Sequence, residues 1–133
     1  MQLLVNIDVD DLSRGVSFYT EAIGLRLDRR LFGGTVAELS GASAKIYLML
    51  KQGGTRPSDK VSTTRDYRRH WTPVHVDFEV ADIDRAVERA VSAGAIVEEI
   101  QSFDWGRQAC MSDPFGHGFC LIEFTNQSYD APE

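Results

Sequence analysis

Three polar side chains alternate along one short stretch of the sequence. His75, Asp77 and Glu79 stand at every second position of the segment VHVDFEV, and a strand places such positions on one face, with neighbours about 6.6 Å apart. A histidine beside a carboxylate can act as a general acid or base on a small polar ligand. We therefore take His75 as a candidate catalytic residue. The alternative is a polar face that is bonded to neighbouring strands or partly wetted.

The two cysteines of the chain flank a turn sequence symmetrically. Cys110 and Cys120 each lie five residues from Phe115 in the DPFG turn, so a regular hairpin would place them opposite one another, with Cβ atoms about 4.5–5.5 Å apart. With His75 nearby, the pair could form a soft-metal site, and a nearby cation could activate Cys120 as a thiolate nucleophile. We favour two small buried apolar side chains, since free cysteine usually behaves that way.

Residues 52–73 carry the only basic cluster of an otherwise acidic chain. This stretch is rich in Gly, Ser, Thr and Arg, and it also contains Tyr67, His70 and Trp71. A lid that meets an anionic ligand would have this composition. A solvated loop or a dimer contact would have it too, and we favour these. The cations are Arg56, Lys60, Arg65, Arg68 and Arg69.

An internal repeat indicates the elements that must position these residues. The segment LLVNIDVDDLSRGV at 3–16 aligns with VHVDFEVADIDRAV at 74–87, which places Asp11 on Asp82. In each copy the alternating apolar residues predict a strand. The aspartate is a good helix N-cap, and the glycine that follows the helical stretch is a stop signal.

Three further strands are expected after each helix, so each copy is a β-α-β-β-β module and the fold class is α+β. We expect one domain over 1–133, with a first module at 1–51, a linker or lid at 52–73 and a second module at 74–126. The expected strands after the helices are 26–30, 35–39 and 45–50 in the first module and 96–103, 108–112 and 118–125 in the second.

The two modules resemble the vicinal oxygen chelate superfamily, which includes glyoxalase I, extradiol dioxygenases and the fosfomycin- and bleomycin-resistance proteins. The resemblance covers most of the chain. It is carried by VDDLSRGVSFYTEAIGL near the start, VADIDRAVERAVSAGA in the second repeat and DWGRQACMSDPFGHGFCLIEF near the end. It implies a mixed sheet that curls around a cleft, in a fold that hosts several chemistries and some pure binders.

Metal-using members of this superfamily hold a divalent ion with four residues at the ends of strands. Carried over position by position, this set implies Leu4, Tyr47, His75 and Cys120 in this sequence. Leucine cannot coordinate a metal, and a tyrosine phenol, whose pKa is about 10, binds hard divalent ions poorly. We therefore predict no metal site of the usual kind and no cofactor.

The resemblance and the missing ligands together suggest a protein that binds a small organic molecule in the cleft. The alternative is a glyoxalase-type lyase, isomerase or dioxygenase with a non-standard metal site or with His75 as acid or base. A third candidate is a dimeric scaffold without a ligand. The residues expected to form the ligand site are Leu4, Asn6, Tyr47, His75, Asp77, Trp105, Cys120 and Ile122.

Charge and hydropathy exclude several other classes. The 133 residues contain 14 Lys and Arg against 20 Asp and Glu, a net charge of −6, which repels phosphate backbones and argues against nucleic-acid binding. No apolar run approaches the roughly 18 residues of a membrane span, and the start MQLLVNIDVDD lacks the features of a signal peptide. We expect a cytoplasmic protein with reduced thiols and, because open sheet edges favour pairing, a homodimer.

Overall fold

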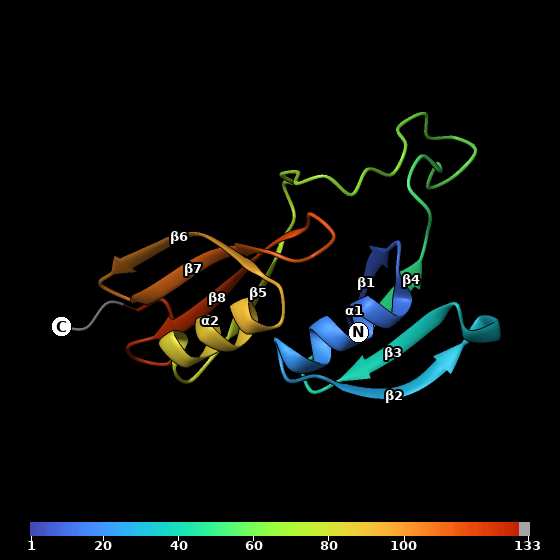
Figure 1. The fold of residues 1–133 in the computed structure, drawn as a ribbon. Helices are drawn as coiled ribbons and strands as arrows, with labels where there is room; N and C mark the ends of the chain where they lie inside the picture. The colour runs from blue at the N-terminus through green and yellow to red at the C-terminus, as the bar shows by residue number, and fades with distance from the viewer. Residues whose placement is uncertain (131–133) are drawn as a thin grey trace. The chain divides into compact units, whose positions relative to one another are not determined.

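The computed structural model describes residues 1–130 and divides them into two compact units, Met1–Arg68 and the chain from Arg69 onward. Each unit contains one β-α-β-β-β module, as predicted, so the α+β fold is confirmed (Figure 1). The first unit contains β1 (Leu4–Val9), α1 (Leu12–Glu21), β2 (Arg26–Leu31), a 3-10 turn (Phe32–Gly34), β3 (Val36–Ser40) and β4 (Lys45–Leu50). The second contains β5 (Val76–Glu79), α2 (Ile83–Ser92), β6 (Ile96–Phe103), β7 (Gly106–Ser112) and β8 (Gly118–Phe124).

The two modules share one strand order. The sheets run β1-β4-β3-β2 and β5-β8-β7-β6. In each, the first strand pairs parallel with the last, and the other neighbours pair antiparallel. Parallel pairing of β1 with β4 and of β5 with β8 places a strand from the repeated segment beside the last strand of its module. The internal repeat in the sequence is therefore a repeat of topology.

The helices begin and end where the repeat predicts. The Asp11 carboxylate accepts a hydrogen bond from the backbone N–H of Arg14 at 3.0 Å, and the Asp82 carboxylate accepts one from Arg85 at 3.2 Å. These bonds satisfy N–H groups that the first turn of a helix leaves without partners. Gly24 follows α1 and Gly94 follows α2, both with positive φ, a backbone conformation that favours glycine.

Each unit buries its own apolar core. In the first unit Phe18 on α1 and Leu48 on β4 are almost fully buried. In the second, Ile83 on α2 and Leu121 on β8 are equally buried. The helix therefore covers one face of its sheet and leaves the other face available for polar residues. No helix within residues 1–130 is both long enough and apolar enough to cross a lipid bilayer.

Strand β5 is shorter than the alternation VHVDFEV predicts. It begins at Val76, which pairs with Phe119 on β8, whereas β8 itself begins one residue earlier, at Gly118. Val74 therefore lies before the start of β8, the strand with which β5 pairs, and it is 83% exposed. The alternation continues in the sequence past the point where a pairing partner exists.

Candidate functional site

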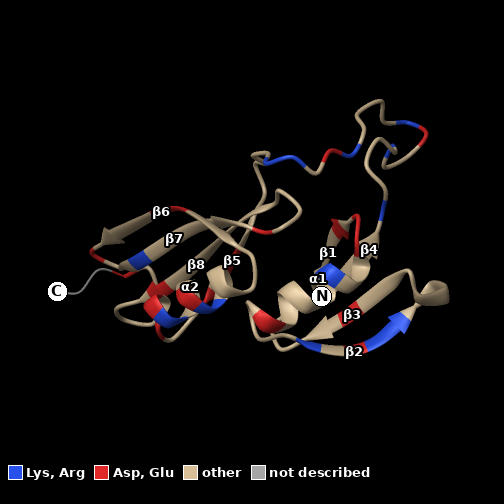
Figure 2. Cartoon of the chain, viewed as in Figure 1, with Lys and Arg blue, Asp and Glu red and all other residues tan. Residues whose placement is uncertain are grey.

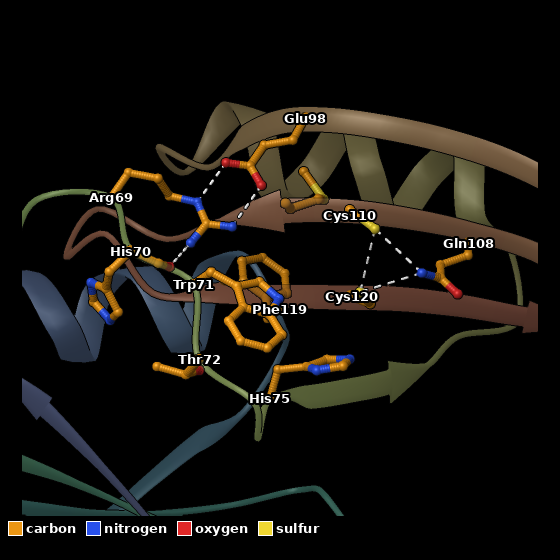
Figure 3. Close-up of a pocket in the computed structure, with 12 residues that line it drawn as sticks. Arg69, His70, Trp71, Thr72, His75, Glu98, Gln108, Cys110, Phe119 and Cys120 are labelled. Atoms are coloured by element: carbon orange, nitrogen blue, oxygen red, sulfur yellow. Dashed lines mark hydrogen bonds and ion pairs between the residues drawn. The ribbon is translucent and has the colours of Figure 1, made fainter.

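A pocket of about 230 Å³ lies wholly within the second unit (Figure 3). One wall is the chain segment from Arg69 to Thr72, which we call the strap. The opposite wall consists of side chains on β7 and β8. The lining residues outside the strap are His75, Glu98, Gln108, Cys110, Met111, Gly118, Phe119 and Cys120.

The strap is fixed at its start by an ion pair to strand β6. Arg69 Nε lies 2.5 Å from Glu98 Oε2, and Nη2 lies 2.8 Å from Oε1, so the guanidinium grips both carboxylate oxygens. The hydrogen bonds from Arg69 lower the pKa of the Glu98 carboxyl because they stabilise its charged form. Arg69 is therefore committed to Glu98 rather than free to receive an anionic ligand.

A second set of contacts ties the strap to the turn between β7 and β8. The backbone N–H of His70 donates to the carbonyl of Gly116 at 3.2 Å, and His70 Nε2 lies 3.2 Å from His117 Nδ1. Trp71 follows directly and is 78% exposed although it lines the pocket. The anchored backbone thus presents a large aromatic ring that the described residues of its own unit leave mostly exposed.

The other arginines of residues 52–73 are also paired with acidic groups. Arg65, only 14% exposed, lies 2.7 Å from Asp8 of β1, and Arg68 lies 2.6 Å from Asp66. Figure 2 shows acidic residues interspersed among the basic ones along this stretch. These contacts neutralise the arginine charges that an anion-binding lid would need.

His75, Asp77 and Cys120 form a cluster at the junction of β5 and β8. His75 Nε2 lies 3.1 Å from Asp77 Oδ1, and Asp77 is paired with Cys120 across the parallel strands. One potential metal-ligating atom from each residue lies within 4.8 Å of those of the other two. The histidine and its carboxylate are partly exposed, whereas Cys120 is buried. The arrangement can orient the imidazole for acid–base work or present three donor atoms to one ion.

The two cysteines lie directly opposite one another, as the symmetry of the turn predicts. Cys110 pairs with Cys120 in the β7–β8 ladder, and their sulfur atoms are 3.7 Å apart. The Gln108 side-chain amide lies within 3.3 Å of one sulfur and 3.7 Å of the other. Burial, followed by the neighbouring Cys110, raises the pKa of the Cys120 thiol to about 12. Cys120 therefore keeps its proton at neutral pH, which argues against the activated thiolate that the sequence left open.

The structure brings together only some of the residues predicted for the ligand site. His75 and Cys120 line the pocket, and Asp77 contacts His75. Trp105 lies outside the lining set, in an aromatic group where its ring stacks on Phe103 at a centroid distance of 4.9 Å. Ile122 is 2% exposed and is also absent from the lining.

Leu4, Asn6 and Tyr47 belong to the first unit. Leu4 and Asn6 are exposed on β1, and Asn6 pairs with Tyr47 on β4, which in turn pairs with Glu38 on β3. The corresponding row of the second unit is Asp77, Cys120 and Cys110, in the same strand order. Equivalent positions of the two modules thus carry different chemistry: amide, phenol and carboxylate in one, and carboxylate and two thiols in the other.

Sequence reasoning did not assign the strap, Glu98 or Gln108 to the site. The only available signal was the cluster RRHW at 68–71, which lies in the predicted linker. Its place beside β6 depends on a contact between Arg69 and Glu98, 29 residues apart. Residue spacing within one element cannot indicate such a contact.

The two β-α-β-β-β modules and the pocket define the class of protein, and comparison with known families gives the same class. The model of the glyoxalase-like domain family matches residues 4–122. This chain belongs to that family, and with it to the vicinal oxygen chelate superfamily.

Solved structures of the same fold share little sequence with this chain. The fosfomycin resistance protein FosX from Listeria monocytogenes is 18% identical, with a TM-score of 0.71 over 94% of this chain and 93% of that one. TioX from Micromonospora sp. ML1 is 20% identical, with a TM-score of 0.69 over 93% and 98%. Lactoylglutathione lyase from Agrobacterium tumefaciens is 16% identical, with a TM-score of 0.66 over 98% of each chain. At these identities the likeness establishes the fold alone.

Curated relatives match over shorter stretches. The anthracycline biosynthesis protein DauV of Streptomyces sp. (strain C5) is 40% identical over 79 residues, which are 59% of this chain and 26% of that protein. An uncharacterized protein of Mycobacterium tuberculosis (strain ATCC 25618 / H37Rv) is 40% identical over 52 residues, 38% of this chain and 31% of that protein. The matches thus span about a quarter to a third of the relatives' length.

Proposed function

We propose that this chain binds a small planar organic molecule in the pocket of the second unit, without the divalent metal of its metal-using relatives. The observation that carries the proposal is the Trp71 ring, which is 78% exposed at the wall of the pocket. Exposed aromatic faces bind flat ligands by stacking, which contributes on the order of 1 kcal/mol beyond the area buried. Phe119 and Met111 supply further apolar lining.

The polar groups of the pocket suit a ligand with little net charge. Arg69 and Glu98 neutralise each other, and His75 and Gln108 remain as hydrogen-bonding side chains in the lining. The volume of about 230 Å³ lies below the roughly 300–1,000 Å³ typical of drug-sized ligands. We therefore expect the pocket to take one ring system and leave any larger substituents in solvent.

The names of similar proteins support a small organic ligand in general. DauV is named for anthracycline biosynthesis and FosX for resistance to fosfomycin, so small organic antibiotics recur among them. The stretch shared with DauV covers a quarter of that protein. It supports a shared binding module rather than a shared overall activity.

A binding titration tests the proposal directly. We expect an anthracycline aglycone, used as the planar probe, to quench tryptophan fluorescence and raise the melting temperature of the chain by mass action. Trp71→Ala should weaken binding about tenfold or more. Trp105→Phe is the matched control and should bind normally, because Trp105 packs against Phe103 outside the pocket. Equal losses in both variants, or no binding by any member of a panel of planar aromatics, would contradict the proposal.

A second candidate is a zinc-dependent enzyme of glyoxalase type, favoured by the His75, Asp77 and Cys120 cluster. A FosX mutant was crystallised with Mn(II), but the corresponding ligand set here includes Leu4, which has no donor atom. The nitrogen, oxygen and sulfur donors within 4.8 Å of one another suit zinc better than Mn(II), which prefers oxygen. When bound, such an ion would polarise a substrate carbonyl as a Lewis acid.

Metal analysis separates the two candidates. Protein purified without chelator should contain well under one equivalent of any transition metal if the first proposal holds. Stoichiometric zinc that is lost in His75→Ala would favour the enzyme. Glu79→Gln, which changes a carboxylate on the same strand face but outside the cluster, is the control and should not alter the metal content.

A further inference from the structure

We propose that Cys110 and Cys120 form an oxidisable dithiol that closes to a disulfide when a hydroperoxide enters the pocket. The reaction does not depend on ligand binding in the pocket, because it requires only the two thiols and an oxidant. Both cysteines are reduced in the structure, and both line the pocket. Three features of the β7–β8 hairpin support the proposal: its register, the position of the sulfurs and the difference in their exposure.

The register places the two cysteines at a non-hydrogen-bonded pair. The backbone N–H of Asp113 donates to the carbonyl of His117 at 2.9 Å, and that of Thr125 donates to Trp105 at 2.9 Å. Hydrogen-bonded and non-hydrogen-bonded pairs alternate along an antiparallel ladder. Counting along the ladder from either of these two hydrogen-bonded pairs makes Cys110 and Cys120 a non-hydrogen-bonded pair. Cα atoms of such pairs are about 4.5 Å apart, within the roughly 4.4–6.8 Å that a disulfide spans.

The sulfur atoms already face each other. They are 3.7 Å apart, and the Gln108 amide nitrogen lies close to both (Figure 3). A disulfide bond is about 2.0 Å long, so rotation of the two side chains is enough to close the gap. The backbone of the hairpin does not need to move, which makes closure compatible with the folded state.

The exposure of the two thiols sets the order of events. Cys110 is partly exposed, whereas Cys120 is 6% exposed, so a hydroperoxide reaches Cys110 first. Its sulfur attacks one peroxide oxygen, so the S–O bond forms as the O–O bond breaks. The departing oxygen takes the Cys110 thiol proton and leaves as an alcohol, or as water when the oxidant is hydrogen peroxide. The neutral Cys120 thiol then attacks the electrophilic sulfur of the Cys110 sulfenic acid. The S–S bond forms, the S–O bond breaks, and the hydroxyl leaves as water with the thiol proton. Two electrons pass from the dithiol to the peroxide.

Because the chain has only two cysteines, intact mass spectrometry gives an unambiguous readout. Chain treated with one equivalent of hydrogen peroxide, in the presence of a chelator, should lose the mass of two hydrogen atoms and both titratable thiols. Dithiothreitol should restore both. In Cys120→Ser the reaction should stop at a sulfenic acid on Cys110, which dimedone traps. In Cys110→Ser the remaining buried thiol should react at least tenfold more slowly than the wild-type pair.

Three results would overturn the proposal. They are wild-type chain that gains oxygen without forming the bond, a disulfide that joins two chains instead of closing within one, and a Cys110→Ser variant that reacts as fast as wild type. Melting curves of both serine variants show that the comparison is made on folded protein. The ligand titration is performed under reducing conditions, so failure of one proposal leaves the other unaffected.

Discussion

At the scale of single residues, Glu38 is a buried carboxylate in the first module. It is 3% exposed and lies 3.2 Å from Arg29 and 3.1 Å from Lys45. Hydrogen bonds from Arg29 and then Lys45 lower its pKa below the ordinary value of 4.5. A carboxyl with a lowered pKa stabilises the fold above the pKa of the unfolded chain, and that contribution is lost as the pH falls through the folded pKa.

Replacement of the Glu38 carboxylate should therefore change how the free energy of unfolding depends on pH in acid. The free energy of unfolding of the wild type should fall as the pH drops below about 4.5, and Glu38→Gln should show a shallower fall, since it has no proton to take up there. Urea denaturation between pH 3 and pH 7 measures both slopes. Glu88→Gln changes an exposed carboxylate on α2 and should keep the wild-type slope. An unchanged slope in Glu38→Gln would contradict the assignment.

Gly106 at the start of β7 is a position where only glycine fits. Its φ is +152°, and a Cβ there would lie 2.1 Å from the carbonyl oxygen of Glu123 on the neighbouring strand. Gly106→Ala should destabilise the chain by about 3 kcal/mol, because the backbone of β8 would have to shift. Gly54→Ala is the control: φ is also positive, at +79°, but no atom lies within 4 Å, so the cost should be about 1 kcal/mol. Chemical denaturation of both variants compares them.

At the scale of elements, the two helix starts provide a matched pair of experiments. Asp11 and Asp82 cap α1 and α2 with nearly identical backbone angles, φ −142° and −141°. Asp11→Ala and Asp82→Ala should each cost about 1 kcal/mol, because each leaves one N–H of the first turn without its side-chain partner. Denaturant unfolding measures both costs. Asp59→Ala, at a side chain that is fully exposed in a 4.0 Å ion pair, should change the stability by less than about 0.5 kcal/mol.

The elements could be predicted from the sequence because their signals are local and occur twice. The capping aspartate, the helical spacing and the terminal glycine all lie within one segment of each repeat, and the symmetric turn around Phe115 fixed the opposition of the two cysteines. The start of β5 was missed because it depends on where β8 begins. The strap was missed for the same reason, since Arg69 finds Glu98 only after the sheet has formed.

At the scale of the whole molecule, the family follows from the repeated topology, whereas the ligand does not. The row of paired residues across each sheet has the same geometry in both modules, but its side chains differ completely, from Asn6, Tyr47 and Glu38 to Asp77, Cys120 and Cys110. Main-chain hydrogen bonding maintains the row regardless of its side chains. The fold can therefore persist while the chemistry of the site changes, and function has to be argued from the side chains present.

The exposed edge of the second sheet bears on assembly: we predict a homodimer formed through β6. This strand is the outer edge of its sheet, all eight of its residues are exposed, and Ile96, Ile100 and Phe103 are 43–64% exposed. An edge strand that exposes several apolar side chains favours pairing with another chain. Light scattering at micromolar concentration should give twice the chain mass of 14.9 kDa.

Ile100→Lys should weaken the dimer at least tenfold by placing a charge in the interface, whereas Val91→Lys, at a 46% exposed position on α2, should leave it intact. A monomeric mass for the wild type would refute the prediction.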